Sequence, residues 1–296
     1  MTSFWQAIRS GSWLTPARGR TYPLVLVGLG ALVLLGLILT ADGLVDRTGK
    51  PIGTDFSSVY AAGVLAGAGE PEAAYDPARQ HAAEIAVFDG RDVPFYGWHY
   101  PPMFLAAAAL LALFPYGLAL FVWMALTLPA YLAVIRAIVP RPQTLLAAAA
   151  FPAVFVDLGH GQNGFLTAAL LGGGLLLLDR RPIVAGLLVG LLAYKPQFGI
   201  LIPLVLVVTG RWTVIATAAA TVIAEGAVTF VLFGEKVWLA FAGSTGFTRR
   251  VVLEAGATGW EKIQSLFSAV RLWGGPVDAA LAAQFALALA LAAGLV

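Results

Sequence analysis

The chain has 296 residues, of which 59% are hydrophobic and only 11% are charged, and its formal net charge is +2. A soluble domain carries about a quarter charged residues, so this composition excludes an ordinary soluble protein. The small net charge does not indicate a nucleic-acid partner, and the absence of cysteine excludes disulfide and thiolate chemistry. Long apolar runs such as residues 24–39 predict an all-α polytopic transmembrane helical bundle, because the strands of a membrane barrel would alternate in polarity.

The first apolar run covers residues 22–40 and follows Arg9, Arg18 and Arg20. It is too long for the core of a signal peptide and lacks a good small-residue cleavage site. Because positive charges favour the cytoplasmic side, we expect the first span of an integral protein of the cytoplasmic membrane, with a cytoplasmic N-terminus. Residues 42–100 then form an extracytoplasmic loop, with short amphipathic helices at 57–67 and 77–88 lying on the membrane.

Basic loops determine the rest of the expected topology. Arginines at 136 and 141, at 180 and 181, and at 211 are expected to face the cytoplasm. This arrangement predicts outer turns at 159–164 and 194–197 and a long outer loop at 234–276. The predicted membrane segments are 116–138, 143–157, 165–178, 183–193, 197–209 and 212–233, with a re-entrant helix at 102–114.

Two of these segments, 183–193 and 197–209, are short. About a dozen helical residues span roughly 18 Å, whereas the hydrocarbon core is about 30 Å thick. The turn between them, which carries Lys195, therefore lies below the outer surface. Because irregular backbone at that depth is tolerated only beside a cavity, we expect a water-filled cavity that opens outward, with Lys195 pointing into it.

The topology places Asp55, His160, Gln162, Asn163 and Lys195 on the same, outer side. Asp55 can accept a proton from an attacking hydroxyl. Lys195 or His160 can hold a phosphate that gains charge as it leaves, and the two amides can bond to sugar hydroxyls. The set is typical of a site for hydroxyl-rich and phosphate-bearing ligands.

Each of these residues also has a structural interpretation. Asp55 could cap the helix that begins near Phe56. His160 could pair with Asp157 at helical spacing, and the turn at 161–164 has an ordinary turn composition. Lys195 could extend to the membrane interface.

Five short motifs occur in order over most of the chain. Together they resemble glycosyltransferase family 87, the membrane α-mannosyltransferases that use a polyprenyl-phosphate-mannose donor and have the C-type glycosyltransferase fold. The motifs are Thr54-Asp55-Phe56-Ser57-Ser58-Val59-Tyr60-Ala61-Ala62-Gly63, Ala74-Tyr75-Asp76, Tyr100-Pro101-Pro102, Gly161-Gln162-Asn163 and Ala193-Tyr194-Lys195-Pro196-Gln197.

The resemblance implies a one-step inverting transfer of a sugar, mannose in that family, from a polyprenyl-phosphate donor to a hydroxyl of a lipid or glycan acceptor. Asp55 would be the general base at the extracytoplasmic face, and no cofactor or nucleotide would be needed. Lys195 and His160 would hold the donor phosphate. The sugar or acceptor would contact Gln162, Asn163, Tyr100 and Gln197.

Family members tend to be longer than this chain, which ends inside an apolar run. We therefore expect residues 1–296 to form one integral membrane domain that is truncated at its C-terminus.

Two other functions remain open from the sequence. A transporter or flippase of a lipid-linked or small polar solute would suit Glu225, which lies in the middle of a predicted span, and the interrupted hairpin at 183–209. No inverted repeat relates the two halves of the chain, however, and the polar residues gather on one side. A non-catalytic assembly subunit is the third interpretation. Acidic residues do not cluster in the sequence, so it predicts no metal site.

Overall fold

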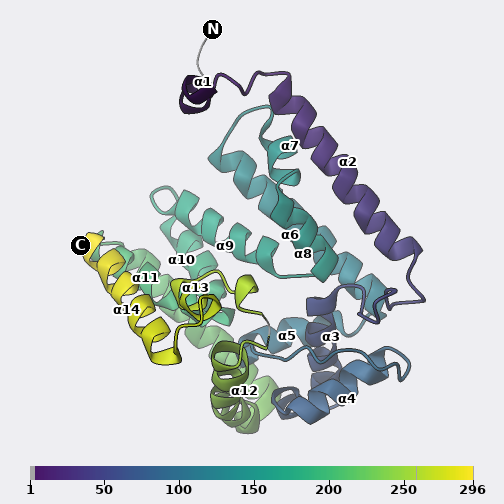
Figure 1. Ribbon diagram of the computed structural model, residues 1–296. Helices are drawn as coiled ribbons and strands as arrows, with labels where there is room; N and C mark the ends of the chain where they lie inside the picture. The colour runs from purple at the N-terminus through teal and green to yellow at the C-terminus, as the bar shows by residue number, and fades with distance from the viewer. Residues whose placement is uncertain (1–3, 258, 296) are drawn as a thin grey trace.

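The computed structural model describes residues 4–257 and 259–295, and within this part of the chain it is 74% helical with no strand (Figure 1). Of the described helices, four are long and apolar enough to cross a membrane. They are α2 (Arg18–Leu39), α6 (Tyr116–Ile138), α14 (Val277–Gly294) and α12 (Trp212–Thr248) with the π-helical turn that continues it to Glu254. The prediction of an all-α polytopic membrane protein is confirmed.

A short helix, α1 (Phe4–Ser10), precedes α2, which runs along one side of the molecule beside α7 (Thr144–Ala149) and α8 (Pro152–His160) (Figure 1). None of the α2 residues is buried, as expected for a helix whose surface faces lipid. A side chain at Gly30 would collide with the ring of Phe155, so this glycine allows α2 to pack against α8.

The prediction of a single helix at 143–157 is wrong, because this segment forms two helices, α7 and α8. Pro152 occupies the first turn of α8, and Phe151 before it has extended backbone angles (φ −64°, ψ 129°). A proline lacks the N–H that would continue the earlier helix and disfavours helical angles in the residue before it.

The segment from 42 to 100 contains α3 (Thr54–Gly67), the 3-10 turn η1 (Pro71–Tyr75) and α4 (Pro77–Val87). The predictions of helices at 57–67 and 77–88 are confirmed. The prediction that 57–67 lies on the membrane surface is wrong. Ten of the 14 residues of α3 are buried, because its small residues allow α5 (Pro102–Leu111) to approach closely. A Cβ at Gly63 would collide with the carbonyl of Ala108. Helix α3 is therefore a core helix.

A second close contact joins α10 (Pro182–Gly190) to α12, beside α9 (Gly164–Leu177). A Cβ at Gly186 would lie 2.6 Å from Cβ of Thr217, and one at Gly190 would lie 2.5 Å from Cβ of Thr221. Two glycines four residues apart let membrane helices approach through their backbones. This contact lets α10 pack directly against the backbone of α12.

The interrupted hairpin expected between 183 and 209 is present. Helix α10 continues into the 3-10 turn η2 (Leu191–Tyr194), which is followed by the 3-10 turn η3 (Pro196–Gly199) and α11 (Leu201–Val208). Lys195 lies at the junction of the two turns, with non-helical backbone angles (φ −122°, ψ 80°).

The segment at 234–276, predicted as an outer loop, is largely helical, so the expectation of a loop is wrong. Helix α12 continues beyond Phe233 to Thr248 through a kink at Gly234 (φ 77°, ψ 179°), a conformation open to glycine. The π-helical turn η4 (Arg249–Glu254), the 3-10 turn η5 (Trp260–Lys262) and α13 (Leu266–Leu272) follow before α14.

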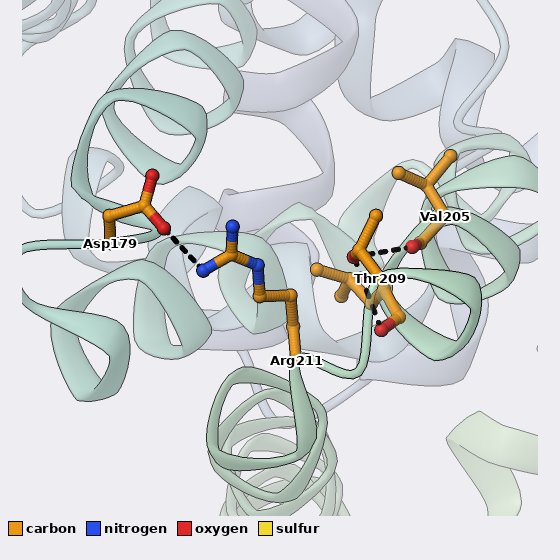
Figure 2. A network of polar contacts seen from close by, with 5 residues as sticks. Asp179, Val205, Thr209 and Arg211 are labelled. Carbon is orange, nitrogen blue, oxygen red and sulfur yellow. Dashed lines mark hydrogen bonds and ion pairs between the residues drawn. The ribbon is translucent and has the colours of Figure 1, made fainter.

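Two of the basic loops lie together. Arg211, at the start of α12, forms an ion pair with Asp179 in the loop after α9, and Thr209 Oγ1 donates to the carbonyl of Val205 at 2.7 Å (Figure 2). The arginines at 180–181 and at 211 therefore belong to the same face of the molecule, as positions on one side of a membrane require.

Candidate functional site

The turn after α8 packs directly on the start of α3. Gly161 has φ 63°, and a Cβ there would lie 2.6 Å from Cβ of Phe56, so a side chain has neither space nor a favourable backbone angle. This contact brings together residues that are more than 100 positions apart. The Gln162 amide donates to Oδ2 of Asp55 at 2.9 Å, and Nδ1 of His160 bonds to Oγ1 of Thr54.

Asp55 does not cap α3, so the structural interpretation of this residue is wrong. The N-cap position belongs to Gly53, which has left-handed angles, and Asp55 lies in the first helical turn. Burial raises the pKa of the Asp55 carboxyl, while the charge of His160, the bond from Gln162 and the charge of Lys262 oppose that rise. A half-buried carboxylate in this setting can hold a proton transiently.

Asn163 and Tyr100 form the next layer of the site. Asn163 Nδ2 donates to the Tyr100 hydroxyl at 2.8 Å, and the Asn163 backbone N–H donates to Oε1 of Gln162 at 2.7 Å. Asn163 is buried, and its Oδ1 has no hydrogen-bond partner among the residues that the structure describes. Burial raises the pKa of Tyr100, so its hydroxyl stays neutral and keeps a proton to donate. An unused acceptor and an unused donor are thus adjacent.

Lys195 interacts with Asp157, and its Nζ lies 5.9 Å from the centre of the Tyr194 ring. The Asp157 carboxylate also interacts electrostatically with Asp55 and His160. A Cβ at Gly164 would collide with this carboxylate, which therefore lies over the N-terminus of α9. Asp157 is thus attracted by Lys195 and repelled by the Asp55 carboxylate, interactions that the sequence did not indicate beyond a pairing with His160.

An apolar cavity of about 660 Å³ lies beside Lys195. Its walls come from the turns η2 and η3, from α10, α11 and α12, and from the start of α5. Pro101, next to Tyr100, lines it, as do Ala193 and Pro196 on either side of Lys195, but Lys195 itself does not. The water-filled cavity expected around Lys195 is therefore not this one, because the residues that flank the lysine and face α12 are apolar.

Two further candidates lie apart from Asp55 and its hydrogen-bonded neighbours. Gln197 is exposed on η3 and, among the described residues, no hydrogen bond connects it to Asp55 or its neighbours. Glu225 lies in α12, four residues from Thr221 and Thr229 on the same face, and its buried Oε2 has no hydrogen-bond partner within residues 4–257 and 259–295. Neither residue joins the Asp55 cluster through a contact in the described part of the chain.

Lys262 was missed from the sequence. It is exposed at the end of η5 and interacts electrostatically with Asp55. Its turn is held by Arg271, whose guanidinium lies 4.5 Å from the Trp260 ring and donates to the carbonyls of Gly275 and Glu254. One signal was available, because a lysine in a loop predicted to be extracytoplasmic departs from the usual charge bias.

The described geometry can be compared with known proteins. A family model described as "Glycosyltransferase family 87" matches residues 98–296. The matched part includes Tyr100, Gln162, Lys195 and Lys262 and begins after Asp55. Neither the curated proteins nor the solved structures with which the chain was compared gave a match.

Proposed function

The chain belongs to glycosyltransferase family 87, and from this premise we propose that it transfers mannose from a polyprenyl-phosphate donor to a hydroxyl acceptor at the extracytoplasmic face. The donor lipid, the sugar, the inverting course and the base Asp55 are the parts of the proposal that go beyond the family. The observation that carries it is the half-buried Asp55 carboxylate, which is held by Gln162 at 2.9 Å and interacts electrostatically with His160 and Lys262.

The proposed reaction is a single displacement. As the acceptor oxygen attacks the anomeric carbon, Asp55 takes the hydroxyl proton, and the bond from that carbon to the phosphate oxygen breaks. The electron pair leaves with the polyprenyl phosphate. Because a phosphate is a stable anion, it needs no proton to depart, and one carboxylate suffices where a glycosidase uses two. Attack opposite the phosphate inverts the anomeric centre.

Cationic side chains favour the leaving group. Lys195 and His160 are proposed to hold the donor phosphate, and Lys262 supplies a further positive charge close to Asp55. Positive groups fixed where negative charge develops stabilise the transition state more than the ground state. The free Asn163 Oδ1 and the neutral Tyr100 hydroxyl suit sugar hydroxyls. Gln197, which is exposed on the hairpin that carries Lys195, is proposed to contact the acceptor.

The apolar cavity supports a lipid donor. Its volume of about 660 Å³ lies in the usual range of ligand pockets, and its walls are almost wholly hydrocarbon. Pro101 borders it beside Tyr100, and Ala193 and Pro196 border it beside Lys195, so a tail in the cavity leaves its phosphate near the polar residues. A nucleotide sugar has no apolar part that would use this space.

The test is sugar transfer by the purified protein in proteoliposomes that contain radiolabelled polyprenyl-phosphate mannose and an acceptor mixture. The wild type is expected to transfer label from the lipid donor and not from a nucleotide sugar, and Asp55→Asn is expected to be inactive at equal expression. Asp92→Asn, which changes an exposed carboxylate in the same segment, is the matched control. Solute uptake without any sugar transfer would instead support a transporter.

A further inference from the structure

Each end of the Gln162 side-chain amide has a hydrogen-bond partner within the protein. Its Nε2 donates to Asp55 Oδ2 at 2.9 Å, and its Oε1 accepts the backbone N–H of Asn163 at 2.7 Å. Its own backbone N–H donates to the carbonyl of Asp157 at 3.0 Å. Both ends of the side-chain amide are therefore occupied within the protein.

The orientation of this amide is set by its partners. A backbone N–H can only donate, so the oxygen of Gln162 must face Asn163, and the NH₂ group must then face Asp55. The backbone is equally restricted, because Gly161 packs against Phe56 in a left-handed conformation. Gln162 is thus a donor fixed in place against one oxygen of the carboxylate.

The two oxygens of Asp55 consequently differ. Oδ2 accepts from Gln162, whereas no hydrogen bond to Oδ1 is found among the described residues. We propose that Gln162 is a positioning residue that orients Asp55, so that Oδ1 is the atom that removes the acceptor proton. This inference rests on the proposed function and assigns the role of a second residue within it.

In the proposed step, Oδ1 forms a bond to the hydroxyl proton while the acceptor oxygen bonds to the anomeric carbon. The phosphate departs with the electrons of the broken bond. Gln162 keeps its hydrogen bond to Oδ2 throughout and touches neither substrate. Its donation favours the ionised carboxylate, which is the form that can act as a base.

The pH dependence of transfer distinguishes positioning from sugar binding. Gln162→Glu preserves the length of the side chain and the acceptor for Asn163, but it places a second carboxylate against Oδ2. Two carboxylates that share one site hold a proton to higher pH. The groups that face Asp55 remain unaltered in this variant, namely His160, Asp157, Lys262, Tyr96 and Tyr100.

We expect Gln162→Glu to move the acid limb of kcat/KM for sugar transfer upward by about one pH unit or more, with activity recovered at high pH. Gln162→Met, which keeps the volume and removes both bonds, should lower kcat about 10-fold or more and leave the donor KM within about two-fold. Gln143→Glu makes the same chemical change at an exposed position before α7 and should leave the profile unchanged.

A raised donor or acceptor KM in both Gln162 variants, with an unmoved acid limb, would overturn the proposal and make Gln162 a substrate ligand. Two variants indistinguishable from the wild type would also overturn it. An inactive Asp55→Asn alongside normal Gln162 variants would refute only the positioning role. An Asp55→Asn variant as active as the wild type would refute both proposals. Monodisperse elution in detergent serves as the check on folding for each variant.

Discussion

Glu84 accepts the backbone N–H of Tyr96 on both carboxylate oxygens, at 3.2 and 3.1 Å, although its side chain is 0% exposed. This contact holds the extended segment that leads to Tyr100 against α4. Gln80, one helical turn earlier, donates to the carbonyl of Ser58 on α3, while no described residue bonds to its Oε1. The segment that carries Tyr100 is thereby connected to the helix that carries Asp55.

Burial raises the pKa of Glu84 to about 8, which predicts a pH-dependent stability. The unfolded chain releases this proton near pH 4.5 and the folded protein only near pH 8, so stability decreases as the pH rises between these values. Glu84→Gln removes the titration and should be the more stable protein at pH 8, by an amount on the order of a few kcal/mol. Thermal unfolding of both proteins in detergent from pH 5 to 9 measures this difference in stability.

The exposed Asp92→Asn provides the comparison for this stability measurement. It should follow the wild-type dependence on pH. If the wild type and Glu84→Gln lose stability in parallel from pH 5 to 8, Glu84 is not protonated in the folded protein.

Lys262→Gln should slow transfer on the acid side of the profile, because it removes a positive charge that favours the ionised, proton-accepting form of Asp55. Since Lys262 is exposed, the expected decrease is about two- to five-fold. The acid limb of the profile should also move upward, since Lys262 opposes the rise in the pKa of Asp55. The measurement is the rate of sugar transfer against pH.

Lys236→Gln tests whether the Lys262 effect is specific, because Lys236 is also an exposed lysine beyond the kink of α12. Its rate should match that of the wild type. Equal losses in the two variants would attribute the effect to overall charge and not to a position near Asp55.

Gly161→Ala should destabilise the protein and reduce transfer, because the new Cβ would lie 2.6 Å from Cβ of Phe56 at a φ of 63°. The left-handed conformation alone costs about 1–2 kcal/mol for a residue with a Cβ. Gly159→Ala is the matched change two residues earlier, where a Cβ would meet Leu34 at an ordinary 3.5 Å. Thermal unfolding and transfer rates of the pair are compared, and equal behaviour would contradict the described packing of the turn.

Ala219→Phe should raise the KM for a long-chain polyprenyl donor, because Ala219 lines the apolar cavity and the ring would occupy part of it. A donor with a short tail should be affected much less. Ala220→Phe, at the next position of α12 and outside the lining residues, provides the control. A KM that rises equally for long and short donors would exclude the cavity as the binding site of the tail.

Much of the helical architecture could be predicted from the sequence, because apolar runs bounded by Gly, Pro and Arg mark helices directly. Residues 116–138 form α6 as expected. The errors arise where packing outweighs polarity. The small residues of α3 allow close approach and place it in the core, and Gly234 bends α12 without ending it.

The site was predicted less completely. Charge bias placed Asp55 and Gln162 on one side, but their hydrogen bond depends on the contact between Gly161 and Phe56, which no local pattern reveals. For the same reason, the sequence did not indicate that Lys195 interacts with Asp157 or that Lys262 approaches Asp55. Contacts between distant segments follow from the assembled helices.

The most direct measurement is the rate at which purified Asp55→Asn protein transfers mannose from polyprenyl phosphate, set against wild-type and Asp92→Asn protein in the same liposomes. Loss of a general base predicts a decrease of about 10²–10⁴-fold for Asp55→Asn alone. A variant that retains the wild-type rate would show that the carboxylate held by Gln162 does not carry the proton.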